Sequence, residues 1–149
     1  MERAVEQQLS YYSKQQAIVI RLEAVLFRDG AAAGFDANNW ITRWKAYINS
    51  EREVYEQASK TAPGELRPAM RKLVDAVSEV TKRMFRNEVN DDRTRFTLAA
   101  NHSGDYSVCL ALLKGLFAAQ VIRMIDDGSQ GSAITLVSNA LATKNYPKI

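Results

Sequence analysis

The sequence predicts an all-α protein, a single-domain bundle of five or six helices over residues 1–149. Apolar residues recur at alternating steps of three and four along most of the chain, which places them on one stripe of each helix. Strict alternation of apolar and polar residues, which marks a half-buried strand, is absent. Hydrophobic residues make up 46% and charged residues 25%, so the chain has the composition of a globular domain. At 149 residues it can bury a core without disulfides.

The first helix is expected from about Glu2 to Arg28, and Gly30 provides a left-handed cap after it. Its apolar stripe consists of Val5, Leu9, Tyr12, Val19 and Leu26. The early charges and the lack of an apolar stretch argue against a secretory signal peptide. The single cysteine, Cys109, excludes an intrachain disulfide and fits a reducing compartment. A cytoplasmic location is therefore expected.

The second helix is expected to begin after Asp36, which is a suitable N-cap. Its apolar residues at helical spacing are Trp40, Ile41, Trp44, Tyr47 and Ile48. Two tryptophans one turn apart usually anchor a core. The alternative is an exposed aromatic shelf, on which bases stack or a partner chain docks. The polar stretch 49–60 is expected to be the solvated end of this helix.

The third helix is expected to begin between Gly64 and Pro68, because proline is tolerated only in a first turn, and to run to about Val89. Its core stripe comprises Leu66, Met70, Leu73, Val77, Val80 and Met84. Asn90 can cap a fourth helix, which residues 101–104 interrupt. Ser132 can cap a last short helix that carries Ile134, Val137 and Leu141.

The fifth helix, residues 106–127, follows Ser103 or Asp105 as a cap and is apolar nearly all round, so we expect it at the centre. Lys114 and Arg123 lie about 180° apart around it, which favours a core helix with charged rims over a membrane span. Two acids at positions 126 and 127 oppose the helix dipole, and only a nearby basic partner would account for them.

The third helix also has a basic outer face. Residues 66–87 hold six basic and two acidic side chains, whereas residues 1–60 hold eight of each. A solvated face is the ordinary interpretation, because Arg71 can pair with Asp75, and Glu79 with Arg83, one turn apart. However, several of these cations lie near helix N-termini, where the dipole disfavours them, and this hints at an external anion. The candidate nucleic-acid contacts are Arg67, Arg71, Lys72, Lys82, Arg83, Arg86, Arg93 and Arg95.

These features favour a non-catalytic subunit that binds the phosphates of single-stranded DNA or RNA, almost without regard to sequence, alongside other protein subunits. In size, helix content and basicity the chain resembles the small helical subunit of CRISPR effector complexes. The resemblance implies a role in lining the path of a bound strand, and it assigns no individual residue.

Two further interpretations remain open. A protein–protein adaptor, such as a secretion chaperone, an immunity protein or an inhibitor, would use Trp40, Trp44, Tyr11 and Tyr12 as anchors. Alternatively, Arg95 and His102, separated by six residues, loosely resemble the Arg-x(4–6)-His motif of HEPN ribonucleases. That resemblance implies that the pair positions a phosphate and moves protons. The ordinary role of such a histidine is to cap a helix end.

Other chemistry finds little support in the residues. One histidine and one cysteine cannot build a zinc site of the usual kind. The phosphate-binding GxxxxGK[ST] loop, the dinucleotide-binding GxGxxG loop and the GxSxG nucleophile motif are all missing from the sequence. We therefore expect no enzymatic activity, no metal and no cofactor.

Overall fold

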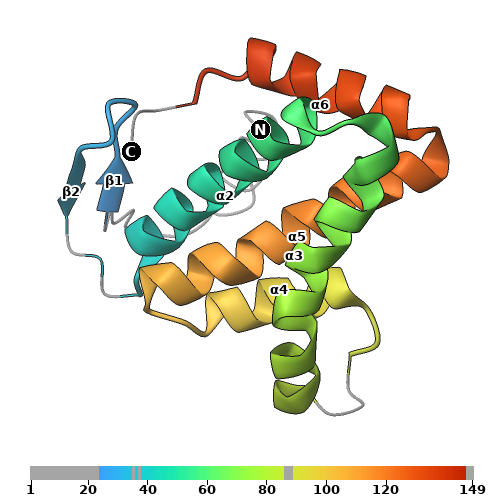
Figure 1. Ribbon diagram of the computed structural model, residues 1–149. Helices are drawn as coiled ribbons and strands as arrows, with labels where there is room; N and C mark the ends of the chain where they lie inside the picture. The colour runs from blue at the N-terminus through green and yellow to red at the C-terminus, as the bar shows by residue number, and fades with distance from the viewer. Residues whose placement is uncertain (1–23, 35, 37, 86–88, 147–149) are drawn as a thin grey trace, which may run out of the picture.

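Five helices and one short hairpin make up the part of the chain that the computed structural model describes, residues 24–34, 36, 38–85 and 89–146 (Figure 1). The helices are α2 (Trp40–Lys60), α3 (Pro63–Met84), α4 (Asp92–Asn101), α5 (Tyr106–Asp127) and α6 (Gln130–Thr143). The predicted all-α class and helical bundle are confirmed.

Helix α5 lies at the centre of the bundle and packs against α2, α3, α4 and α6 (Figure 1). Its buried side chains include Leu112, Phe117 and Val121. This confirms the central position that its apolar surface predicts. Among the described helices, α5 alone is long and apolar enough to cross a membrane, and half of its most apolar stretch is buried inside the bundle, as in the core helix of a globular protein.

The buried seam of α3 follows the prediction as far as Val77, with Leu73 only half-buried. Leu66, Met70 and Val77 are buried as expected, but Val80 and Met84 are exposed, and the prediction for them is wrong. The C-terminal turns of α3 extend beyond α4 and α5 at the bottom of Figure 1, so none of the other described helices covers that side. The last buried position is Thr81, whose hydroxyl donates to carbonyl oxygens of its own helix.

Residues 49–60 of α2 were expected to be a solvated helix end, and this expectation is wrong because half of them are buried. Small side chains at Ala46, Ser50 and Ala58 allow close packing on the core, and the Ser50 hydroxyl lies 3.1 Å from the Leu110 carbonyl oxygen of α5. The buried polar side chains on this face are satisfied: Asn49 donates to the Tyr106 hydroxyl. Residues 49–60 are therefore mostly polar in sequence, yet they include a narrow strip of buried side chains.

Glu51, in the middle of α2, binds two residues of the segment that follows α6. Its side chain is only 8% exposed, accepts from the Lys144 ammonium and lies 3.1 Å from the Tyr146 hydroxyl. Burial of the Tyr146 ring, together with the nearby Glu51 carboxylate, raises the pKa of Tyr146 above its ordinary value.

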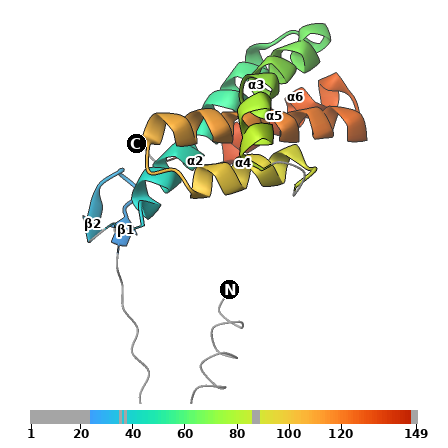
Figure 2. The same cartoon turned by 90° about the horizontal axis from the view of Figure 1, so that it is seen from below.

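A hairpin precedes α2, in place of the end of the predicted first helix. Strand β1 (Ala24–Leu26) pairs antiparallel with β2 (Ala32–Gly34), and β1 lies beside the first turns of α2, with β2 on its outer side (Figure 2). The prediction of helix up to Arg28 is wrong, and its earlier part, residues 2–23, lies outside the described residues. The physical reason is the turn. The Asp29 carboxylate accepts the backbone N–H two residues on, and Gly30 has a φ of 87°.

Side-chain caps begin most of the helices, close to the predicted positions. Asp91, one residue after the predicted cap, begins α4, and Asp105 begins α5. Ser129 caps α6, and the predicted cap Ser132 is its partner in a capping box. The Asp36 carboxylate accepts a backbone N–H at the start of α2.

Candidate functional site

Three aromatic side chains near the start of α2 are exposed. Trp40 is 56% exposed, Trp44 is 55% exposed and Tyr47 is 42% exposed. They share one stripe of the helix, which is exposed along the first turns of α2 and continues into the buried positions Val54 and Ala58. The prediction that the tryptophans anchor a core is wrong, and the exposed aromatic shelf is found instead. Large apolar side chains gathered on a surface mark an interaction site.

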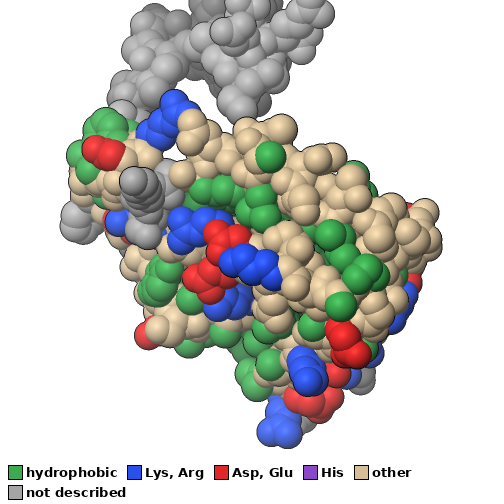
Figure 3. Space-filling model, turned by 45° about the horizontal axis from the view of Figure 1, so that its top comes forward, with side chains coloured by type: hydrophobic (Ala, Val, Ile, Leu, Met, Phe, Trp, Pro, Cys, Tyr) green, Lys and Arg blue, Asp and Glu red, His purple; other side chains and the backbone are tan. Residues whose placement is uncertain are grey.

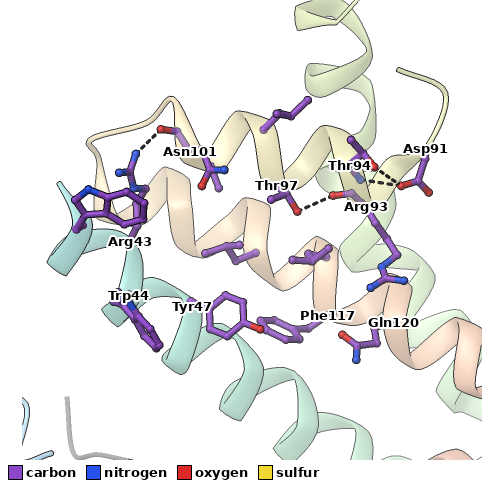
Figure 4. A pocket seen from close by; sticks show the side chains of 15 residues that line it. Arg43, Trp44, Tyr47, Asp91, Arg93, Thr94, Thr97, Asn101, Phe117 and Gln120 are labelled. Carbon is purple, nitrogen blue, oxygen red and sulfur yellow. Dashed lines mark hydrogen bonds between the residues drawn. The ribbon is translucent and has the colours of Figure 1, made fainter. Parts of the chain in front are cut away.

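These side chains form one wall of a groove of about 800 Å³ between α2, α4 and α5 (Figure 4). Helix α4 forms the other wall, and Leu113, Leu116 and Phe117 of α5 form the floor. The Tyr47 and Phe117 rings meet edge to face, with centroids 4.9 Å apart. Trp44 is in edge contact with Tyr47, at 6.3 Å. The aromatic wall is therefore held in place by the buried floor.

Two arginines lie at opposite ends of the groove (Figure 4). The Arg43 guanidinium lies over the Trp40 ring, 4.7 Å from its centroid, and donates to the Asn101 carbonyl. Arg93 comes from the first turn of α4. In both side chains the Nε–H group is buried and has no hydrogen-bond partner among the described residues. Neither arginine forms an ion pair within that part of the chain.

One carboxylate lines the same groove. Asp91 accepts the backbone N–H of Thr94, 2.9 Å away, and its hydroxyl, 2.7 Å away. These hydrogen bonds lower the pKa of Asp91, so it stays ionised at neutral pH. With two cations and one anion, the groove has a small positive surplus and a largely apolar interior.

A second hollow of about 630 Å³ lies on the other side of the tryptophans. It is lined by residues 24–28 of the hairpin region and by Ile41 and Ile48 of α2. Trp40 and Trp44 line both hollows and form a ridge between them, and the exposed ring of Phe27 extends the apolar surface.

The predicted nucleic-acid contacts do not form one continuous basic surface. On the face shown in Figure 3, basic and acidic side chains are intermixed. Four of the eight candidates are paired with carboxylates: Arg67 with Asp126, Arg71 with Asp75 at 3.3 Å, Lys82 with Glu79 at 3.3 Å, and Arg95 with Asp92. The predicted partner of Glu79 was Arg83, and that detail is wrong. Arg67 is the basic neighbour that the acids at the end of α5 require.

The other four candidates have different surroundings. Lys72 and Arg83 are exposed on α3 and form no ion pair with the residues described. Arg93 comes from α4 and lines the groove. Arg86 lies outside the described residues.

Arg95 and His102 both lie on α4, but each is engaged locally. Arg95 is buried, pairs with Asp92 and donates to the Val89 carbonyl at 2.9 Å. His102 ends the helix, and its Nδ1 lies 2.7 Å from the Leu98 carbonyl. The histidine thus has the ordinary helix-ending role, and the arginine is not free to position a phosphate. Within the described ranges, no three histidine, cysteine or acidic side chains gather as a metal site would require.

Comparison of the chain with models of protein families, with curated proteins and with solved structures finds no match. The resemblance to a CRISPR subunit stays a prediction, and function must be argued from the groove itself.

Sequence reasoning missed Arg43 and Phe117 as members of the site. Arg43 follows Trp40 by three residues, so their proximity on one helix face could have been found from spacing. Phe117 belongs to α5, whose apolar surface gives no sign of which side faces the groove.

Proposed function

We propose that this protein is a non-catalytic binding protein that holds another protein in the groove between α2, α4 and α5. The observation that carries the proposal is the exposure of Trp40 and Trp44 beside a preformed groove. Tryptophan, tyrosine and arginine are the residues enriched at the energetic centres of protein interfaces. The remaining anchors of the adaptor hypothesis, Tyr11 and Tyr12, lie outside the described residues.

The energy available from the two tryptophans is sufficient for specific binding. Each ring has more than half of its surface in water. Covering that surface is worth about 2–3 kcal/mol per tryptophan, at about 25 cal/mol per Å². The edge contacts from Tyr47 to Trp44 and Phe117 reduce the ordering that binding requires.

Nucleic-acid binding through α3 remains a second candidate. The observation in its favour is that Lys72 and Arg83 are exposed and unpaired within the described part of α3. The pairs that hold Arg71 and Lys82 are exposed, and such pairs are worth only about 0–1 kcal/mol, so a polyanion could displace them. Against it, the groove that offers stacking surfaces has only one surplus positive charge.

A peptide-display selection tests the proposal. A random library of 16-residue helical peptides is selected on the full chain, and binders are measured by tryptophan fluorescence at 150 and 500 mM salt. The test variant is Trp40→Ser with Trp44→Ser. The matched control is Leu136→Ser, which removes an equally exposed apolar side chain from α6, outside the groove.

We expect the double variant to lose at least thirtyfold in affinity, the control to bind as the parent does, and salt to have little effect. Circular dichroism checks that both variants fold. Peptides that bind the double variant normally would refute the groove as the site. If a 20-nucleotide single strand binds instead, with a log–log salt slope of about −3 to −4, the protein is a nucleic-acid binder. Replacing Arg67, Arg71 and Lys72 by glutamine would then flatten that slope.

A further inference from the structure

The groove has a charge pattern that specifies its partner more closely. Arg43 and Arg93 mark its two ends, and the space between them is lined by the rings of α2 and the apolar floor of α5 (Figure 4). Arginines with carboxylate partners are common elsewhere in the described fold, as at Arg67, Arg71 and Arg95. Arg43 and Arg93 lack such partners within the described residues. Each also has a buried Nε–H without an acceptor, a feature that Arg95 shares although its guanidinium pairs with Asp92. A buried donor without an acceptor is uncommon and requires an explanation.

Resting on the proposed function, we infer that the partner is an amphipathic helix with two acidic residues seven positions apart and apolar residues between them. The carboxylates pair with Arg43 and Arg93, and the apolar side chains cover Trp44, Tyr47 and Phe117. Small turns of the two arginines bring their Nε–H groups to the carboxylates, where paired N–H donors fit a carboxylate well.

The spacing follows from α4. Arg43 is bonded to the carbonyl of Asn101, which lies eight residues after Arg93 on the same helix. At a rise of about 1.5 Å per residue, the two ends of the groove are about 12 Å apart. Two helical turns of a partner span about 11 Å and return residue i+7 to the same face as residue i, whereas residue i+8 is turned aside by about 80°.

A helix fits the groove better than an extended chain. The walls and floor are helices, so the groove offers no sheet edge to hydrogen-bond an extended backbone. An extended segment laid over Leu113, Leu116 and Phe117 would bury peptide groups against apolar side chains, whereas a helix satisfies its own backbone.

A protein partner also fits better than a polynucleotide. The groove holds two cations and one ionised carboxylate, Asp91, and this surplus of one positive charge is too small for the continuous charge of a phosphate backbone. A peptide can place a single carboxylate at each end of the groove and apolar side chains between them.

The test first determines the sequences of the selected peptides and then measures the affinities of matched synthetic peptides. The same helical library is selected on the parent chain and on a variant with Arg43→Gln and Arg93→Gln. We expect acids at i and i+7 to be enriched at least tenfold on the parent relative to the variant. The control variant is Lys72→Gln, an exposed cation on α3 outside the groove, which should select the same peptides as the parent.

Synthetic peptides complete the test. The best binder is compared with versions in which one acid is replaced by glutamine or moved to i+4 at the same net charge. Each change should weaken binding five- to tenfold to the parent. When a protein variant lacks only Arg43 or only Arg93, removing the acid that pairs with that arginine should not change the affinity further. A double-mutant cycle between each arginine and each acid measures this.

The outcomes separate this inference from the proposed function. Binders that depend on Trp40 and Trp44 but show no acid pair would overturn the inference and leave the function standing. The absence of any groove-dependent binder would overturn both. The inference is also wrong if a single-stranded oligonucleotide displaces the peptides at lower concentration. A dimer of the full chain that the tryptophan variant abolishes would assign the groove to a second copy and overturn it too.

Discussion

Replacing Gly115 by alanine is expected to destabilise the protein, because side chains of α3 and α4 lie close against α5 at this residue. A Cβ atom on Gly115 would lie 2.5 Å from Cγ2 of Val77 and 3.1 Å from the ring of Phe96. Valine on a helix has essentially one side-chain rotamer, and Phe96 is fully buried, so neither neighbour can move aside cheaply.

The size of the effect follows from opposing contributions. Overpacking at so short a contact costs about 2–3 kcal/mol. The better helix propensity of alanine offsets about 1 kcal/mol of this. Gly115→Ala should therefore lower the free energy of unfolding by about 1–2 kcal/mol and lower Tm by about 3–8 °C. Val77→Ala alone removes two buried methyl groups and should cost about 2 kcal/mol.

The double variant distinguishes this explanation from general damage. In Gly115→Ala/Val77→Ala, the new methyl group enters the space that the valine leaves. We expect a total loss of about 1 kcal/mol, although independent effects would sum to about 3–4 kcal/mol. Gly64→Ala is the matched control, because a Cβ at Gly64 meets no atom within 4 Å, and it should stabilise the protein by about 0.5–1 kcal/mol.

Urea unfolding followed by circular dichroism measures the free energy of unfolding of the parent and of the four variants. A Gly115→Ala protein as stable as the parent, or a double variant whose loss equals the sum of the single losses, would refute the close approach of α5 to Val77.

Three further predictions concern single side chains. Asp91→Ala should lower the free energy of unfolding by about 1 kcal/mol at neutral pH. Because the pKa of Asp91 is lowered in the folded protein, the difference in stability between parent and variant should shrink as the pH falls below 3.8. A difference that does not change with pH would contradict the role of the carboxylate as a cap. Burial raises the pKa of Tyr55 to about 12, so ultraviolet titration should show late ionisation, and stability should fall between pH 10 and 12 less steeply in Tyr55→Phe. Arg67→Gln should change stability in urea by less than about 1 kcal/mol, since both it and Asp126 are about half exposed; a larger loss would show that the pair is structural.

The sequence was sufficient to predict α5 because this helix is apolar nearly all round and so must lie inside the bundle. Its length, its Asp105 cap among two candidates, and its central position all follow from an apolar run bounded by turn residues. The partner for the acids at its end was also anticipated, and Arg67 of α3 supplies it.

Helix α2 was harder to predict because its most hydrophobic residues are not the ones that it buries. The aromatic residues of its first turns are exposed, whereas Ser50, Val54 and Ala58, farther along the helix, pack on the core. Small side chains allow two helix backbones to approach, and that advantage exists only once a second helix is in place. No property of α2 alone shows which end of the helix the neighbouring helices will cover.

The candidate site was predictable only in part. The exposed aromatic shelf was one of two interpretations of the tryptophan pair. The meeting of Arg43 and Arg93 in one groove was not predictable, because they are fifty positions apart and are brought together only when α2 and α4 pack on α5.

The order of the helices has a consequence for synthesis. Helices α2, α3 and α4 leave the ribosome before α5, yet their apolar seams face it. Until residue 127 has been made, the apolar surfaces of α2, α3 and α4 that pack on α5 therefore stay exposed to solvent. During this interval the nascent chain is most vulnerable to aggregation and proteolysis.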